Sequence, residues 1–136
     1  MATFTDTEIE YLTSQPLGRF ATVGKDGRPH VTPVGVFCDT DTLVIGCVAT
    51  MTATKKFRDV LANPDVAVVV DDLATVDPWA PRGIEIRGWA EALMDGGGEV
   101  GRLLGAGFPF DEVYLRIHPR RIVAWGLDGA AARDVV

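Results

Sequence analysis

The sequence predicts an α+β protein that is mainly antiparallel β-sheet with a few short helices. About seven segments have the alternating or valine-rich pattern of β-strands, and short turns join most of them. One strong helical pattern lies inside the chain, and another stands near its start. The chain has 136 residues and is 47% hydrophobic, which fits one domain over residues 1–136. Closing this many strands into a barrel would remove their open edges.

The first expected element is a helix over about residues 5–14. Thr5 and Glu8 have the spacing of a capping box, in which each side chain accepts a hydrogen bond from a free backbone N–H of the first turn. Ile9 and Leu12 follow three residues apart and give this helix an apolar side.

A β-hairpin is expected next, with strands over residues 20–23 and 29–38 around an Asp-Gly turn. Pro33 has no backbone N–H to donate to a sheet, so it indicates an edge or irregular segment in the second strand. A further strand is expected over residues 43–48, after a second polar turn.

The clearest internal helix follows this strand and ends at Asn63-Pro64, because the residue before a proline disfavours helical backbone angles. A threonine hydroxyl can cap the helix by accepting a hydrogen bond from a free N–H of the first turn, and three threonines stand there: Thr50, Thr52 and Thr54. The run of valine and alanine over residues 66–70 is typical of a buried strand.

Lys55 and Lys56 occupy the first turn of this helix, where the helix dipole favours negative charge. Each lysine is disfavoured there by a few tenths of a kcal/mol unless an anion joins it. Free N–H groups, hydroxyls and two ammonium groups would together form an anion site. The alternative is a solvated basic face whose lysine stems cover the edge of the core.

The second half of the chain is expected to be mainly strand and loop. Residues 71–81 are polar, contain proline and carry Trp79, so they are expected to form a loop. The remaining elements, in chain order, are a long strand over residues 82–93, a short helix over residues 99–106, strands over residues 112–118 and 121–127, and a loose tail over about residues 129–136.

Composition excludes several classes of protein. The net charge of −6 argues against a general nucleic-acid binder. No apolar run approaches the roughly 20 residues of a membrane span, and residues 1–10 lack the features of a signal peptide. Cys38 and Cys47 form neither a disulfide framework nor a metal spacing, so reduced thiols and a cytoplasmic location are expected.

The sequence identifies no catalytic side chain and no metal site. His30 and His118 are far apart, no cluster of cysteine and histidine exists, and Ser14 is the only serine. Difficult chemistry would therefore have to come from a bound cofactor, whose phosphate could occupy the anion site. The tryptophans at positions 79, 89 and 125 could line a flat ring or pack in the core or an interface.

Several short segments, in this order and spacing, resemble the pyridoxamine 5'-phosphate oxidase-like family of FMN-binding split barrels. These segments are GRFATVGKDGRPH (residues 18–30), VTPVG (31–35), KKFR (55–58) and Asn63-Pro64 before the valine-rich strand. Three others resemble the actinobacterial branch that uses the deazaflavin coenzyme F420, namely DPW (77–79), RGIEIRG (82–88) and IHPRRIVAWG (117–126).

The resemblance implies a Greek-key split β-barrel and a homodimer with two cofactor sites between subunits. It places the cofactor phosphate near Thr52, Thr54, Lys55 and Lys56, with Thr50 at the same turn. It also implies that the cofactor ring lies along a short segment of strand, Thr32-Pro33-Val34.

Two more contacts follow from the resemblance, together with one departure from it. Trp79 and Arg82 are expected to reach the site from the partner subunit. Many relatives carry asparagine where this chain has Asp59. A carboxylate facing a phosphate is unfavourable, so Asp59 is expected to face away or to pair with Arg58.

The implied function is an F420-dependent oxidoreductase that transfers a hydride to a small unsaturated substrate. A hydride carrier needs no side-chain nucleophile, which suits this sequence. The alternatives are an FMN-dependent oxidoreductase of the same fold, a haem-binding relative, and a non-catalytic carrier of deazaflavin or flavin. The proton donor is not identified, with solvent or His30 as candidates.

Overall fold

One antiparallel sheet of eight strands forms the body of the protein. The computed structural model describes residues 3–135. The strands run in the order β2-β1-β5-β6-β7-β4-β3, and β8 pairs with β7 outside this path. Their bounds are β1 (Gly18–Val23), β2 (Pro29–Val34), β3 (Phe37–Asp39), β4 (Thr42–Ile45), β5 (Asp65–Thr75), β6 (Ala80–Leu93), β7 (Tyr114–Trp125) and β8 (Ala132–Asp134).

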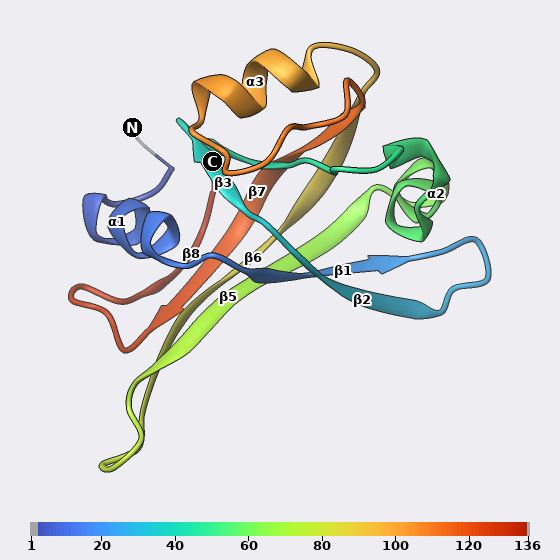
Figure 1. Cartoon of the computed structure of the whole chain (residues 1–136). Helices are drawn as coiled ribbons and strands as arrows, with labels where there is room; N and C mark the ends of the chain where they lie inside the picture. The colour runs from blue at the N-terminus through green and yellow to red at the C-terminus, as the bar shows by residue number, and fades with distance from the viewer. Residues whose placement is uncertain (1–2, 136) are drawn as a thin grey trace.

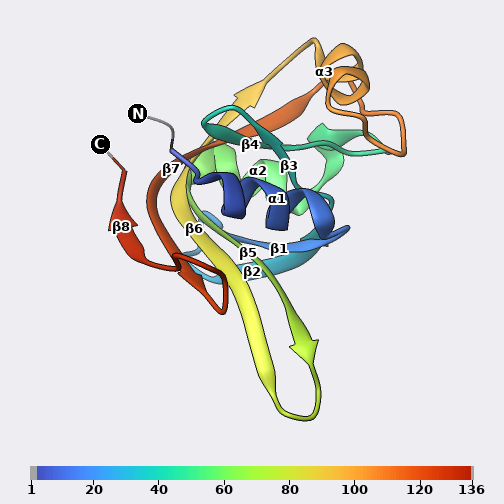
Figure 2. The ribbon, with the colours of Figure 1, turned by 90° about the vertical axis from the view of Figure 1, so that its left-hand side faces the viewer.

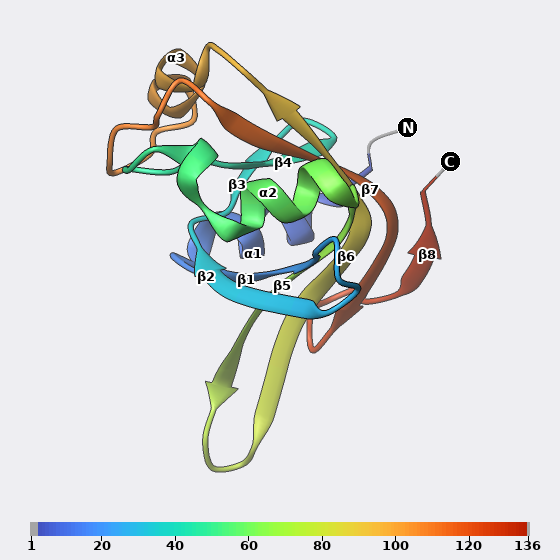
Figure 3. The same cartoon turned by 90° about the vertical axis from the view of Figure 1, so that its right-hand side faces the viewer.

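Three α-helices and one 3₁₀ turn complete the fold. They are α1 (Asp6–Ser14), η1 (Met51–Ala53), α2 (Lys55–Ala62) and α3 (Gly97–Leu103). The sheet curls around α1 and α2, while α3 lies at one end of the molecule (Figures 2 and 3). Its end strands β2 and β3 do not pair with each other within the described residues, so the barrel is split rather than closed. The predicted α+β split barrel of mainly antiparallel strands is confirmed.

The core lies inside the curl of the sheet. Alternate residues of each central strand point inward, as the period of two requires. Val68 of β5, Ile86 of β6 and Ile122 of β7 are fully buried, and α2 adds Phe57. The capping box at α1 is present, since Thr5 Oγ1 accepts from Glu8 N at 3.1 Å and Thr5 N donates to Glu8 Oε1 at 3.0 Å.

The loop predicted over residues 71–81 is wrong for most of its length. β5 continues to Thr75 and β6 begins at Ala80, so a long hairpin extends away from the body of the molecule (Figure 1). Asp71 pairs with Gly83 and Asp72 with Arg82 across this hairpin. Polar side chains do not prevent strand pairing here, because the cross-strand ion pair of Asp72 with Arg82 compensates their charges.

The two strands predicted over residues 112–118 and 121–127 are one strand, β7. Pro119 does not end the strand, because the register against β6 shifts between Arg87 and Gly88 at that point. Gly88 makes the bulge possible, since a Cβ there would clash with the backbone oxygen of His118. Conversely, the single strand predicted over residues 29–38 is divided into β2 and β3.

The expected loose tail is wrong for residues 132–134, which form β8 on the edge of β7. Arg133 of β8 donates to both carboxylate oxygens of the buried Glu8 on α1, at 2.9 and 2.6 Å, and to Thr3 O at 2.8 Å. This ion pair explains the order, because it ties the C-terminal segment to the first helix. Val136, the last residue of the predicted tail, lies outside the described residues.

Candidate cofactor site

The start of α2 is built by a tight turn. The chain leaves β4 and forms the 3₁₀ turn η1, then enters α2 at Thr54. Thr54 Oγ1 accepts a hydrogen bond from Phe57 N at 3.3 Å and donates one to Met51 O at 2.7 Å. Of the three candidate caps, Thr54 is therefore the N-cap of α2. Thr50 precedes η1 without a side-chain capping bond, and Thr52 is exposed within η1.

The two lysines of the first turn have different surroundings. Lys55 Nζ lies 3.0 Å from Asp59 Oδ1, one helical turn further along α2. Lys56 is half-buried and makes no ion pair or side-chain hydrogen bond with any residue between positions 3 and 135. Of the two lysines of the predicted anion site, Lys55 is therefore in an ion pair with Asp59, and Lys56 is available to bind an anion.

Asp59 corrects one prediction. It was expected to face away from the phosphate or to pair with Arg58. The pairing with Arg58 is wrong, since Asp59 is buried against β1 and accepts hydrogen bonds from Thr22 Oγ1 at 2.8 Å and from Lys55. Arg58 instead donates to Ala53 O at 2.9 Å. Burial alone would raise the pKa of Asp59, but the bonds from Thr22 and Lys55 outweigh it and hold the pKa below its ordinary value.

The sequence indicated one of the two contacts that Asp59 makes with Lys55 and Thr22. Lys55 and Asp59 are four residues apart, a spacing at which opposite charges meet on a helix. Thr22 is distant in sequence, and only the packing of α2 against β1 brings it to Asp59. Gly24 leaves room for the carboxylate, because a Cβ at that position would lie 2.7 Å from Asp59 Oδ1.

His30 of β2 belongs to the same neighbourhood. It is opposite Thr22 in the β1–β2 register, and Thr22 donates to Asp59 Oδ2. Its Nδ1 atom is buried and has no hydrogen-bond partner among the residues that the structure describes. His30 is thus half-buried and faces the α2 side, rather than being a simple residue of the strand surface.

The predicted ring strand lies at the edge of the sheet, as Pro33 indicated. β2 is the last strand in the sheet order, and Pro33 is exposed opposite Arg19. Thr32 is half-buried and Val34 is buried. Because alternate residues share a face, both are on the same face of β2 as His30, the face toward α2. Figure 3 shows α2 above this hairpin.

Trp79 and Arg82 lie away from α2 in the same subunit. Trp79 is at the turn of the extended β5–β6 hairpin, with 69% of its surface exposed. Arg82 binds Asp72 through two hydrogen bonds of 2.7 and 2.9 Å, and its guanidinium lies over the Tyr11 ring at 5.2 Å. Within one chain, the predicted site residues therefore form separate groups on β2, at the start of α2, and on the hairpin.

The donors at the start of α2 fit a phosphate group. Lys56 supplies an uncommitted ammonium group, and the first backbone N–H groups of a helix have no partner within the helix. The exposed hydroxyl of Thr52 stands one turn earlier. Such a donor set suits the phosphate of F420 or of FMN equally well. Within residues 3–135, no group of three or more metal-ligating side chains is assembled.

Comparisons with known proteins agree with this architecture. Residues 4–125 match the family model described as pyridoxamine 5'-phosphate oxidase. The chain is 44% identical over 133 residues to a 5a,11a-dehydrotetracycline/5a,11a-dehydrooxytetracycline reductase of Streptomyces rimosus, and the match covers 97% of this chain and 89% of the relative. In the described part of the chain, no helix has the length and hydropathy needed to cross a membrane.

Solved structures share the fold. An F420 reductase is 25% identical with a TM-score of 0.67, covering 88% of this chain and 98% of its own. A conserved hypothetical protein of Mycobacterium tuberculosis has a TM-score of 0.70 at 24% identity, covering 91% of this chain and 86% of its own. At that identity the second likeness supports the fold alone.

Proposed function

The chain belongs to the pyridoxamine 5'-phosphate oxidase family and is an oxidoreductase, and we propose that it is an F420-dependent reductase of a conjugated double bond. The observation that carries this proposal is the 44% identity, over nearly the whole chain, to a reductase of dehydrotetracyclines. The name of that enzyme describes the reduction of a dehydro compound, that is, of a carbon–carbon double bond. The structural likeness to an F420 reductase favours the deazaflavin over FMN.

The proposed roles of the residues follow from their surroundings. Lys56, Thr52 and the first N–H groups of α2 hold the cofactor phosphate, and Thr50 and Thr54 shape the turn that presents them. Thr32, Pro33 and Val34 lie along the cofactor ring, where an edge strand leaves backbone groups for hydrogen bonding. Bound F420 in its reduced form supplies the hydride, while the protein orients both reactants and excludes water.

The proposal also includes the assembly and location of the protein. A homodimer would place Trp79 and Arg82 of each subunit at the cofactor site of the other. The hairpin that carries Trp79 extends beyond the body of the subunit, as such a contact requires (Figure 1). We place the protein in the cytoplasm, with both cysteines reduced.

The experiment is a pair of binding titrations, with F420 and with FMN, followed by turnover. Reduced F420 is mixed with the protein and a panel of conjugated enones, and its oxidation is followed by absorbance. We expect F420 to bind more tightly than FMN and to be oxidised faster than in the protein-free blank. Tighter binding of FMN would reject the deazaflavin, and binding of F420 without turnover would identify a carrier.

A further inference from the structure

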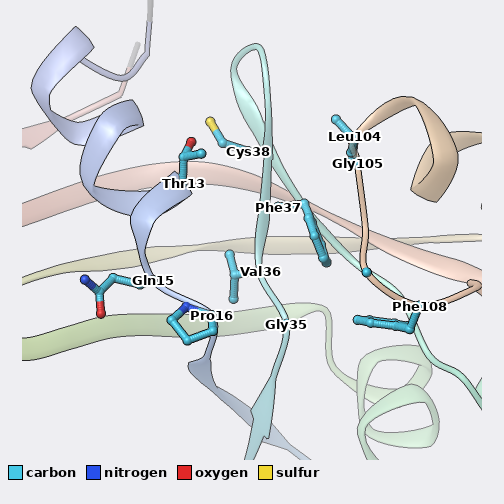
Figure 4. A pocket seen from close by; sticks show the side chains of 11 residues that line it. Thr13, Gln15, Pro16, Gly35, Val36, Phe37, Cys38, Leu104, Gly105 and Phe108 are labelled. Atoms are coloured by element: carbon cyan, nitrogen blue, oxygen red, sulfur yellow. The ribbon is translucent and has the colours of Figure 1, made fainter.

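A cavity lies beside the segment that joins β2 to β3. Its volume is about 370 Å³, and residues 35–38 form its floor. The C-terminal end of α1 provides one wall through Thr13, Gln15 and Pro16, as Figure 4 shows. The loop after α3 provides the opposite wall, which includes Leu104 and Phe108.

Two aromatic rings line this cavity. Phe37 and Phe108 are half-buried and lie edge to face, with ring centroids 6.1 Å apart. Both pack on Phe110, at 5.5 and 5.4 Å. Phe110 is buried between Gly46 and Gly101, where any Cβ would meet its ring. The aromatic wall is therefore fixed by the core behind it and not by a ligand.

The cavity adjoins the proposed ring strand. Its floor begins at Gly35, the residue directly after Val34. Glycine keeps the space between the two rings open at this point, since a Cβ at position 35 would lie 3.3 Å from Phe37 and 3.5 Å from Phe108. A molecule seated on these rings would thus lie beside a cofactor that runs along β2.

We propose that this cavity binds the substrate, and that the substrate is a flat, multi-ring conjugated carbonyl compound. This inference rests on the proposed function, which supplies the hydride. A rigid wall of phenylalanine rings favours a planar ligand, because offset or edge-on ring contacts add about 0.5–1.5 kcal/mol beyond the buried area. The hydroxyl of Thr13 is on the facing wall, where it can bond a ring oxygen, whereas the Gln15 amide donates to Ser14 Oγ and Asp72 Oδ2. The volume is within the range of small-molecule sites.

The reaction in this cavity is balanced without an additional reagent. A hydride from the reduced cofactor forms a C–H bond at the β-carbon of the enone, and a proton from solvent adds at the α-carbon. The carbon–carbon double bond is reduced, and the cofactor is oxidised by two electrons. No side chain of the cavity has to exchange electrons.

The test uses tetracycline as a probe, because it is a multi-ring carbonyl compound that lacks the 5a,11a double bond named in the related reductase. Its binding is followed by fluorescence and by amide ¹H–¹⁵N spectra, with and without saturating F420. We expect shifts of the Gly35, Gly105 and Gly107 amides, whose residues all line the cavity. Shifts confined to other regions, or no binding by the natural protein, would overturn the inference.

Variants of the cavity lining test which residues bind tetracycline. We expect Phe108→Ala to weaken tetracycline binding about tenfold and Phe108→Leu about threefold, because leucine keeps the apolar volume but not the ring. Gly35→Ala should weaken binding by narrowing the floor, and it needs no unusual backbone angle. Leu103→Ala is the matched control, since Leu103 is 68% exposed on α3 and does not line the cavity.

The two proposals fail separately. Unchanged tetracycline affinity in folded Phe108→Leu and Gly35→Ala variants would overturn the cavity, whatever the result with F420. If the natural protein does not bind F420 but tetracycline still shifts the amides of Gly35, Gly105 and Gly107, the cofactor assignment is overturned and the cavity is supported as a binding site.

Discussion

Lys55 Nζ and Asp59 Oδ1 are 3.0 Å apart, on successive turns of α2. The carboxylate is buried and the ammonium is half-exposed, so the pair holds Lys55 down against the helix. This contact gives the two neighbouring lysines different roles. Lys55 neutralises a buried charge, and Lys56 remains available for an anionic ligand.

The first prediction separates these two roles. Lys56→Ala is expected to weaken F420 binding by about 1.5–3 kcal/mol, the value of a charge-assisted hydrogen bond, with little change in melting temperature. Lys55→Ala should mainly lower the melting temperature, because Asp59 then keeps only the bond from Thr22. Calorimetric titration and thermal denaturation of both variants provide the check. Equal losses of affinity in the two variants would contradict this division.

The second prediction concerns the buried carboxylate. Asp59→Asn removes a negative charge beside the anion site and releases Lys55, so F420 affinity should rise by about 0.5–1 kcal/mol. Stability at pH 7 should fall, because an amide attracts the Lys55 ammonium more weakly than a carboxylate does. The pKa of Asp59 is lowered in the folded protein, so its stabilisation is present above its unfolded pKa of about 3.9 and is lost as pH falls through the folded value. Asp59→Asn should therefore flatten the acid limb of the stability profile, and an unaltered limb would exclude this role.

Patterns along the chain predicted the parts of this site that depend on local rules. Thr54 as a cap, the helix end before Pro64 and the edge position of Pro33 follow from backbone requirements that one or two residues determine. The family resemblance added the split barrel itself. These are features that need no knowledge of distant partners.

Long-range pairing determined what the sequence could not predict. Nothing near Asp72 indicates that Arg82 will lie opposite it and extend a strand through a polar segment. Pro119 indicated the end of a strand. The glycine that accommodates the bulge there, Gly88, is 31 positions earlier, so no neighbouring residue shows that the strand continues. Likewise, Arg133 is ordered by a glutamate at the other end of the chain.

The third prediction tests the network around Arg82. Asp72 has its pKa lowered to about 2, chiefly by the hydrogen bonds from Arg82. This stabilisation is complete above the unfolded pKa of about 3.9 and disappears as pH falls toward 2. Arg82→Ala should therefore lower the melting temperature at pH 7 more than at pH 2.5, and Arg82→Lys should restore only part of the loss, because lysine cannot form the two-pronged contact. The same loss at both pH values would show that Asp72 is not the partner that matters.

The fourth prediction asks whether Trp79 serves the partner subunit. Trp79 is exposed at the tip of the hairpin, so Trp79→Ala should leave the melting temperature of the protein unchanged. If the hairpin reaches the other subunit, F420 affinity should fall, because a large aromatic contact is lost. Light scattering establishes the assembly state of each sample. Val76→Ala, an exposed neighbour on the same hairpin, is the control for nonspecific effects of shortening an apolar side chain.

The fifth prediction concerns the clamp between the two ends of the chain. Burial alone would raise the pKa of Glu8, but its bonds with Arg133 and Thr5 hold the pKa below 4.5. Arg133→Ala removes the main partner and leaves a buried carboxylate, so unfolding free energy at pH 7 should fall by about 1.5–3 kcal/mol. The loss should shrink as pH falls through about 4.3, because burial without Arg133 raises the pKa of Glu8 in the folded variant, which then binds a proton and no longer holds a buried charge. Arg120→Ala breaks the exposed pair with Asp65 and is the matched control, for which we expect a change within about 0.5 kcal/mol. Denaturant unfolding at pH 7 and pH 4 measures both variants, and equal effects of the two would show that β8 adds no more than an ordinary surface contact.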